Sequence, residues 1–515
     1  MSLTERLKWS VNFEGRVCYK EYSTPQKDFL EVMLMKSSNS GLNRRNFLKV
    51  GGMSTLALTL GSTGVFSLAG ATKGFAADSS KPTSGFGGYG PLVKDPNGVL
   101  DLPRGFHYKM LSRTGDIMPN GDLVPSAHDG MAAYKGEKGT TILVRNHENG
   151  TNSDYPVNGK KPWSAGAAGG TTTLIVGQNN KVIDQYVSSS GTIRNCAGGA
   201  TTWGTWLTME ETRDMGHGFV FEVNPLDPEN EMSRTPIRDM GYFSHEAGHV
   251  DPSTGIWYLT EDASPSFLYR FTPHDRSQKL GSLQKGGILE AAAIDELPAA
   301  AASQFSTGQK FGVVWKKLNP EIAQQDAKDK GCIQFSRLEG AYFSEGTLWF
   351  DDTSAGSAHL GRVYRYTPAT NNLELFYEST DKNDLEAPDN ITITPWGDLW
   401  IAEDGGGNDR IVGLTPEGNI YTFAENMMNG SEFAGPTFSP DGNTFFVNMQ
   451  TPGITFAIWG PFARRNSTRR RAMNQALPPA SLAPVVSDKL TAFAEEQGMS
   501  ILEAAALERH GMPIL

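Results

Sequence analysis

Six copies of one short phrase in this 515-residue chain end in polar or acidic side chains. Each copy opens with a glycine, continues as a short apolar run and then delivers a polar pair. The pairs are Arg145-Asn146, Glu210-Glu211, Glu261-Asp262, Asp351-Asp352, Glu403-Asp404 and Asn448-Met449. Carboxylates that converge on one place repel one another and raise each other's pKa unless cations lie among them. The four acidic pairs therefore predict a metal site.

A cysteine precedes the second phrase. Cys196 lies in the glycine-containing segment 194–199, just before the strand that ends in Glu210-Glu211. A thiolate there would be a soft ligand for a transition metal, and a site that mixes it with carboxylates indicates more than one kind of ion. The alternative is a disulfide between Cys196 and Cys332 in an oxidising compartment. The position of Cys196 beside an acidic strand end favours the ligand role.

The apolar runs that carry these groups have the composition of buried strands. Runs such as Ile256–Thr260 and Asp398–Ala402 are rich in β-branched and aromatic residues. A second strand-like phrase usually follows, for example at 218–225 and 362–368. Self-similarity at this period, with several strands per unit, is typical of a β-propeller. We expect an all-β fold, a six-bladed β-propeller in which equivalent strand ends meet on one face.

Further carboxylates precede the phrases by a regular offset. Glu246, Glu339 and Asp389 each lie seven to nine residues before an opening glycine, where the loop into an innermost strand would reach the central channel. The candidates for inward-facing oxygens are Glu211, Glu246, Glu261 or Asp262, Glu339, Asp389, and Glu403 or Asp404. For any one acid, a solvated turn or a structural hydrogen bond between blades is the alternative. The repetition in several blades favours ligands for the set.

One arginine lies beside these acids. Arg337, two residues before Glu339, is suited to hold an anion over the metals, because a guanidinium grips phosphate in a bidentate manner. The alternative is a salt bridge that relieves the acidic cluster. The chain contains no GxSxG elbow, P-loop or HExxH motif. Its formal net charge of -11 and scattered basic residues exclude a nucleic-acid-binding class.

The propeller is expected to span residues 78–465. The interval from Gly255 to Gly346 is longer than the others, and the surplus falls at about 280–330. There the run 288–294 and the Gln-, Asp- and Lys-rich stretch 316–330 predict a helical insertion between blades, either a lid over one face or a peripheral ornament. Residues 466–515 predict a linker followed by an amphipathic helix, from Ser487 to His510, that packs on the propeller.

Residues 1–77 are expected to be an export leader. The pair Arg44-Arg45 lies in a twin-arginine signature, a mildly apolar stretch follows at 50–70, and small residues at 74–77 suit signal cleavage. The stretch is too polar to predict a stable membrane span. We expect export by the twin-arginine machinery, with the mature protein in the periplasm or outside the cell.

Several long motifs resemble one known family, the PhoX family of secreted alkaline phosphatases. The motifs occur in the family's order between about residues 95 and 465, and they are Arg194–Thr212, Ser244–Asp262, Arg337–Phe343, Asp389–Gly406 and Glu432–Pro461. The resemblance implies a six-bladed propeller that carries two ferric and three calcium ions and releases phosphate from small phosphomonoesters. The twin-arginine leader fits this family.

The resemblance also implies roles for individual residues. Cys196 would be an iron ligand, and three acids would be carboxylate ligands in the iron–calcium cluster: Glu211, Glu246 and Glu339. The acids that resemble calcium ligands are Asp389, Glu403 and Asp404, and Asp262 and Glu148 are further candidate ligands. Arg337 and Asn146 would contact the substrate phosphate.

Two other functions compete with this interpretation. A calcium-dependent propeller lactonase or phosphodiesterase would need neither iron nor a thiolate, so Cys196 argues against it. A non-catalytic propeller that binds a partner would use calcium only as a structural plug. The many inward acids and Arg337 argue against that class, because binding propellers usually place their specificity on outer loops.

Overall fold

The computed structural model describes residues 88–462 and 488–510. The chain divides into two compact units, Met1–Ser79 and Ser80–Leu515, and all described residues belong to the second. The expected leader with Arg44-Arg45, and the linker before residue 488, lie outside the described residues. None of the helices within 88–462 and 488–510 has the length and apolar character needed to cross a membrane.

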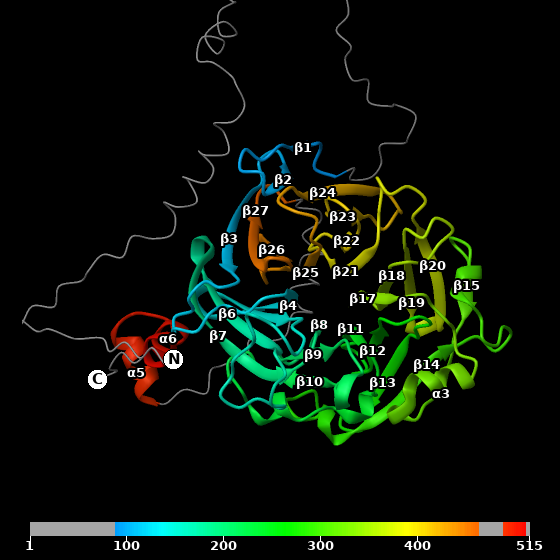
Figure 1. Ribbon diagram of the computed structural model, residues 1–515, viewed down its shortest axis with the longest axis horizontal. Helices are drawn as coiled ribbons and strands as arrows, with labels where there is room; N and C mark the ends of the chain where they lie inside the picture. Colours follow the sequence, from blue (N-terminus) through cyan, green and yellow to red (C-terminus); the bar gives the residue numbers. More distant parts are fainter. Residues whose placement is uncertain (1–87, 463–487, 511–515) are drawn as a thin grey trace, which may run out of the picture. The chain divides into compact units, whose positions relative to one another are not determined.

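Six antiparallel sheets form the blades of a propeller, which confirms the predicted fold class (Figure 1). From the inner strand outward, the first blade contains β4 (His128–Lys135), β5 (Thr141–His147), β6 (Gly169–Gly177) and β7 (Lys181–Thr192). The second contains β8 (Asn195–Ala200), β9 (Trp206–Glu210) and β10 (Val220–Val223). The third contains β11 (His245–Val250), β12 (Trp257–Glu261), β13 (Tyr269–Pro273), β14 (Gly287–Ala293) and β16 (Val314–Lys317).

The remaining blades include strands from distant parts of the chain. The fourth contains β17 (Leu338–Ser344), β18 (Thr347–Asp352), β19 (Arg362–Thr367), β20 (Asn372–Glu378) and β15 (Lys310–Gly312). The fifth contains β21 (Pro388–Ile393), β22 (Leu399–Glu403), β23 (Arg410–Leu414), β24 (Ile420–Asn426), β2 (Leu100–Pro103) and β1 (Leu92–Val93). The sixth contains β25 (Phe433–Phe438), β26 (Thr444–Met449), β27 (Ile454–Trp459) and β3 (His107–Arg113).

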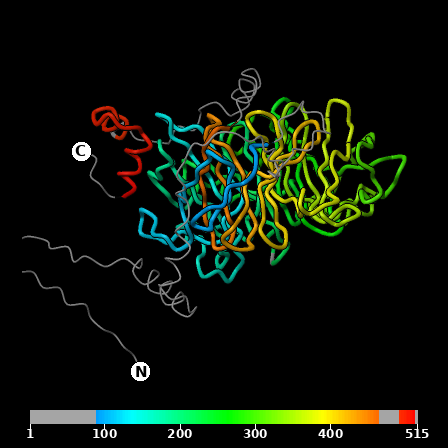
Figure 2. The backbone as a smooth tube through the Cα atoms, turned by 90° about the horizontal axis from the view of Figure 1, so that it is seen from above, coloured from blue at the N-terminus to red at the C-terminus, as the bar shows by residue number. Residues whose placement is uncertain are grey.

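The N-terminal strands close the ring. Strand β3 is the outermost strand of the sixth blade, and β1 and β2 extend the fifth. Inner strands of neighbouring blades contact one another all the way round, including β25 against β4. Figure 2, which is turned by 90° from Figure 1, shows the ring from its edge. Strands from the start of the described chain thus pair with strands near its end, and this pairing closes the ring.

Apolar side chains fill the spaces between blades. Trp257 and Leu259 of the third blade pack on Leu207 and Met209 of the second, and Trp400 of the fifth lies in a cluster shared with the sixth. Each such side chain, when fully buried, stabilises the fold by about 1.5–3 kcal/mol. The second strand of every blade is buried on both faces, which explains the continuous apolar runs in the sequence.

Of the two stretches of the 280–330 insertion that were predicted to be helical, 316–330 contains a helix, whereas the run 288–294 is strand and that part of the prediction is wrong. Strand β14 covers the run expected to be helical and pairs with β13 on one side and β16 on the other. Leu289 and Ala291 pack into one inter-blade cluster and Ala292 into the next, so both faces are apolar and the sequence shows no period of two. The α-helix in this segment is α3 (Ala323–Asp329).

The C-terminal segment contains two helices rather than the single one expected, α5 (Asp488–Glu496) and α6 (Ile501–Arg509). Gly498, with φ of +65°, ends the first, and the Ser500–Glu503 capping box begins the second. The predicted packing on the propeller is confirmed. Leu502 lies in the apolar cluster of the first blade, and Arg509 binds Asp184 of β7 at 2.7 Å.

Candidate metal centre

All six inner strands begin with the same irregularity. The first residue of each inner strand pairs with the last residue of the blade's second strand, and the register then shifts within the next few residues. Such a β-bulge re-aims the side chain beside it. In five blades the bulge therefore gives the second residue of the inner strand a common orientation at one end of the central channel, whereas in the sixth Ala434 still pairs with Asn448 and the register shifts after it.

The side chains at these six second positions are the core of the candidate site. They are Asp129, Cys196, Glu246, Glu339, Asp389 and Ala434. Five of the six can ligate a metal. The residue that directly follows each second strand forms an outer set: Glu148, Glu211, Asp262, Thr353, Asp404 and Gln450.

One backbone hydrogen bond links the two sets in every blade. The N–H of each outer-set residue donates to the carbonyl oxygen of the residue two positions before the inner-strand ligand, at 2.8 to 3.3 Å. The donor–acceptor pairs are Glu148–Ala127, Glu211–Arg194, Asp262–Ser244, Thr353–Arg337, Asp404–Ala387 and Gln450–Glu432. This repeated bond fixes the end of the second strand against the start of the inner strand, so the acids of both sets are held on the same side.

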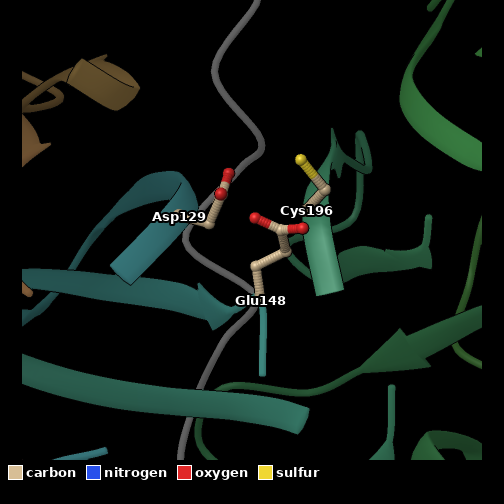
Figure 3. A group of neighbouring side chains, drawn as sticks. All are labelled: Asp129, Glu148 and Cys196. Carbon is tan, nitrogen blue, oxygen red and sulfur yellow. The ribbon is translucent and has the colours of Figure 1, made fainter. Parts of the chain in front are cut away.

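Ligand atoms gather into three overlapping groups, in each of which they lie within 4.8 Å of one another. The groups are Asp129, Glu148 and Cys196; Cys196, Glu211 and Glu246; and Glu246, Glu339 and Asp389. Figure 3 shows the first group, with the three side chains turned toward a common space. Because Cys196 and Glu246 each belong to two groups, the three form one continuous cluster that draws on five blades.

The cluster is strongly acidic and removed from water. Burial raises the pKa of Asp129 to about 6, of Glu148 to about 7 and of Glu211 to about 8, and neighbouring carboxylates add to each shift. Burial and the surrounding acids raise the pKa of Glu246 and of the Cys196 thiol well above their ordinary values. Cations among these groups would remove the repulsion and allow the carboxylates and the thiol to ionise.

Two arginines partly balance this charge from equivalent positions in two blades. Arg337 donates to Asp262 through Nε and Nη2, at 2.8 and 2.7 Å, and its Nη2 also lies 2.8 Å from Glu339. Arg194 pairs with Glu148 at 2.7 Å and with Glu211. The salt bridge considered for Arg337 from the sequence is therefore present. Its side chain remains 41 % exposed, so it stays accessible from solvent.

Asn146 has a different position from the one that the resemblance implied. It is fully buried, and Nδ2 donates to the carbonyls of Cys196 and Ala197 at 2.8 and 2.6 Å. Its Oδ1 accepts from Trp206 and Thr208. No polar atom of Asn146 is left for a phosphate. Its place in the structure is that of a positioning residue, which ties β5 to the bulge that carries Cys196.

Glu403 also lies outside the three groups. Arg410 donates to both of its carboxylate oxygens at 2.7 and 2.8 Å, and the N–H of Glu386 donates at 2.8 Å. The acids that end the second strand in two other blades behave similarly: Glu210 accepts from backbone N–H groups of loop 217–219, and Asp352, the second acid of its pair, accepts from those of Ser336 and Arg337. These acids end the second strand and hold neighbouring loops, whereas the next residue belongs to the outer set.

Two acids near the cluster were not predicted. Asp129 occupies the inner-strand position in the first blade, ten residues before Gly139 and so one residue beyond the offset of seven to nine that identified the other inner acids. Glu432 precedes Ala434 by two residues, as Arg337 precedes Glu339. Burial, with Asp389 and Asp404 nearby, raises the pKa of Glu432 well above its ordinary value. Glu432 thus adds an acidic group near the cluster from the sixth blade, whose inner-strand position is Ala434.

The donor set fits a mixture of metal ions. One sulfur and several carboxylates lie together, and the two cysteines among the described residues, Cys196 and Cys332, are free rather than bonded to each other. Oε2 of Glu246 is buried without a hydrogen-bond partner in the structure, which is costly unless a cation satisfies it. The sulfur suits a transition metal, and the all-oxygen group of Glu246, Glu339 and Asp389 suits a hard cation such as calcium.

Comparisons with known proteins agree with this geometry. The family described as alkaline phosphatase PhoX matches residues 87–185 and 178–453 of the chain. PhoX of Pseudomonas fluorescens, solved with vanadate, a transition state analogue, is similar to it in fold, with a TM-score of 0.58 and 18% identity over 74% of this chain and 98% of that one.

Other solved structures are more distant. Virginiamycin B lyase from Staphylococcus aureus has a TM-score of 0.36 and 13% identity over 69% of this chain and 99% of that one. A gluconolactonase from Xanthomonas campestris has a TM-score of 0.38 and 11% identity over 72% and 98%. No curated protein sequence matches the chain significantly. Because the family match spans well over half of its residues, the chain belongs to the PhoX family of alkaline phosphatases and is a phosphoester hydrolase.

Proposed function

We propose that this chain is an exported alkaline phosphatase that releases phosphate from small phosphomonoesters, using two ferric and three calcium ions held at one end of the propeller channel. The observation that carries the proposal is the continuous cluster of three ligand groups, built by five blades and lined by two arginines. A binding propeller has no need for so many mutually repelling buried acids. A calcium lactonase or diesterase has no need for the thiol in their midst.

The proposed ligands follow from the chemistry of the three groups. Cys196, with Glu211 and Glu246 on one side and Asp129 and Glu148 on the other, suits iron because it combines sulfur with anionic oxygen. The calcium ligands are drawn from the all-oxygen side of the cluster: Glu246, Glu339, Asp389 and Asp404. Glu403 and Asp262 are left out of the proposed set because Arg410 and Arg337 occupy both carboxylate oxygens of each.

The chain's own side chains contribute charge and orientation. Arg337 uses Nε and Nη2 for its acids, which leaves the N–H groups of Nη1 for a phosphate oxygen. Arg194 holds Glu148 and Glu211 in the equivalent place in the second blade. When bound, the metal ions supply Lewis acidity toward the phosphoryl oxygens and activate water for attack. Phosphoryl transfer depends mainly on such positioning and charge neutralisation.

The activity is tested with purified mature protein and three substrates: p-nitrophenyl phosphate, bis-p-nitrophenyl phosphate and a lactone. We expect hydrolysis of the monoester, its loss after treatment with a calcium chelator and its return when calcium is restored. We also expect competitive inhibition by vanadate, the ion found in the Pseudomonas fluorescens structure. Hydrolysis of only the diester or the lactone, or of none of the three, would refute the proposal.

Export is a separate part of the proposal and has its own test. We expect the leader, residues 1–77, to send the folded protein through the twin-arginine machinery, as the pair Arg44-Arg45 indicates. The variant Arg44→Lys/Arg45→Lys keeps the charge and should leave the enzyme inside the cell. Its recovery in the periplasm or the medium at the unsubstituted protein's level would show that another route is used.

A further inference from the structure

A polar cavity of about 600 Å³ lies beside the metal centre. Its walls come from the loop after β9, from the loop after β12 and from helix α3 of the 280–330 insertion, and they include Arg213, Asp262, Phe267, Gln324 and Lys328. Small-molecule sites usually fall between about 300 and 1,000 Å³. The cavity therefore has room for a group the size of a sugar or a short organic acid.

A series of contacting side chains links the cavity wall to the metal centre. Asp262 lines the cavity and also binds Arg337 at 2.7 and 2.8 Å. Arg337 in turn lies 2.8 Å from Glu339, which is a member of the metal-ligand cluster. A phosphate held at Arg337 would thus lie near the cavity, with Asp262 between them. The alcohol part of the ester could then extend into the cavity.

The cavity wall carries two cations that form no salt bridge among the described residues, although Arg213 interacts electrostatically with the buried Glu261. Arg213 is exposed, and its Nη1 donates to Gln324 of α3 at 2.6 Å, which orients the guanidinium between the second blade and the helix. Lys328 is exposed near the end of α3. Of the two acids in the wall, Asp262 is already neutralised by Arg337, and Asp214 remains. Pro265 adds apolar surface.

We propose that this cavity holds the alcohol part of the phosphomonoester and favours alcohols that carry a second anionic group, such as a carboxylate or another phosphate. The inference rests on the proposed phosphatase function and adds the substrate class. Arg213 and Lys328 are the specificity-determining residues, since each can pair with the second anion at the far end of the substrate. Helix α3, the helical part of the insertion, then serves as the wall that selects substrates.

A matched pair of esters isolates the second anion. 3-Phosphoglycerate and glycerol 3-phosphate share one carbon skeleton and differ in a carboxylate against a hydroxymethyl group. The quantity to compare is the ratio of kcat/KM for the first ester to that for the second. We expect Lys328→Gln and Arg213→Gln each to lower this ratio about two- to five-fold, the effect of one partly exposed ion pair. The double variant should lower it by the product, and added salt should weaken the preference.

Lys317→Gln is the control, because Lys317 is an exposed lysine on β16 of the same insertion and does not line the cavity. The ratio of the two kcat/KM values for Lys317→Gln should equal that of the unsubstituted enzyme. Among residues 88–462 and 488–510, the side chain of Lys328 has no hydrogen-bond or ion-pair partner, so its variant stays informative even if Arg213→Gln loosens α3. Ratios unchanged in both variants, with p-nitrophenyl phosphate still hydrolysed, would overturn the subsite alone. Failure of the unsubstituted enzyme on p-nitrophenyl phosphate would overturn the phosphatase function itself.

Discussion

Cys196 occupies the position in the second blade that an aspartate or a glutamate occupies in four of the other five. The backbone there is the same in every blade, so the choice of side chain decides the chemistry of the site. A thiol surrounded by buried acids ionises only if a cation stabilises it, because burial and those acids raise the pKa of Cys196. The cysteine is therefore the residue on which the iron assignment depends most.

Replacing Cys196 tests whether this residue is a metal ligand or only a buried thiol. Cys196→Ala should lose most of its iron, and phosphatase activity should fall about 100-fold or more. Cys332→Ala is the matched control, since Cys332 is fully buried in an apolar cluster away from the ligand groups. It should keep both iron and turnover. Metal analysis by mass spectrometry, beside a p-nitrophenyl phosphate assay, measures the two. Full iron content in Cys196→Ala would remove this residue from the ligand set.

Replacing Asn146 tests whether its side chain contacts the substrate or positions the segment that carries Cys196. Asn146→Ala leaves the carbonyls of Cys196 and Ala197, and the donors of Trp206 and Thr208, without their partner. Each buried unsatisfied group costs about 1–3 kcal/mol, so we expect the free energy of unfolding to fall by about 3 kcal/mol or more. Urea unfolding measures this. The vanadate inhibition constant of the metal-loaded fraction should stay the same, whereas a weaker constant with unchanged stability would indicate direct phosphate contact.

At the scale of strands, the two acids of a pair have different roles in the second, third and fifth blades. The first acid ends the second strand and is held by hydrogen bonds from the protein, and the second acid follows the strand and joins the outer set. In the fourth blade the pair is shifted by one residue, so Asp352 ends the strand and Thr353 joins the outer set. The sequence shows both acids side by side and offers no sign of which is which. The distinction depends on the register of the inner strand, which pairs with the first acid before the bulge. For this reason Glu403 was predicted as a ligand together with Asp404.

The fifth blade allows a direct comparison of the two roles. Glu403→Gln removes the charge from a buried ion pair with Arg410, and breaking such a pair typically destabilises a protein by about 3–5 kcal/mol. Its calcium content should be unchanged. Asp404→Asn should show the reverse, lower calcium content with nearly unchanged unfolding. Calcium analysis and thermal unfolding of both variants provide the check, and calcium loss in Glu403→Gln without destabilisation would restore Glu403 to the ligand set.

The propeller and much of the site could be predicted from the sequence because both repeat. The glycine-led phrases mark the second strand of every blade, and the acids before them mark the inner strands. Asp129 was missed because it lies ten residues before its glycine, just outside the offset of the other inner acids, and because the first blade's phrase ends in Arg145-Asn146 rather than in acids. The strand β14 was taken for a helix because both of its faces are buried, which removes the alternation that identifies a strand.

For the whole molecule, the metal-free centre is a source of instability that depends on pH. The pKa values of Asp129, Glu148 and Glu211 are about 6, 7 and 8 when folded, above the ordinary values of 3.8 and 4.5. Between about pH 4 and 8 these three acids therefore bind more protons in the folded chain than in the unfolded chain. The free energy of unfolding of chelator-treated protein should then fall as pH rises through this window.

Bound metal ions should reverse that trend. Cations stabilise the ionised carboxylates, so the metal-loaded protein should keep its stability as pH rises from 5 to 8 and unfold at a higher temperature throughout. Differential scanning calorimetry of loaded and chelated samples at several pH values gives the comparison. A chelated protein whose Tm rises with pH across the window, or equals that of the loaded protein at pH 8, would show that the acids are not held together as described.

The central claim is that side chains from five blades gather around metal ions at one end of the channel. The most direct test is a crystal structure of the exported protein with anomalous diffraction data recorded on both sides of the iron absorption edge. We predict anomalous peaks within bonding distance of Cys196 Sγ and between the carboxylates of Glu211 and Glu246. An anomalous map without a peak among these side chains, in a crystal of active enzyme, would contradict the account.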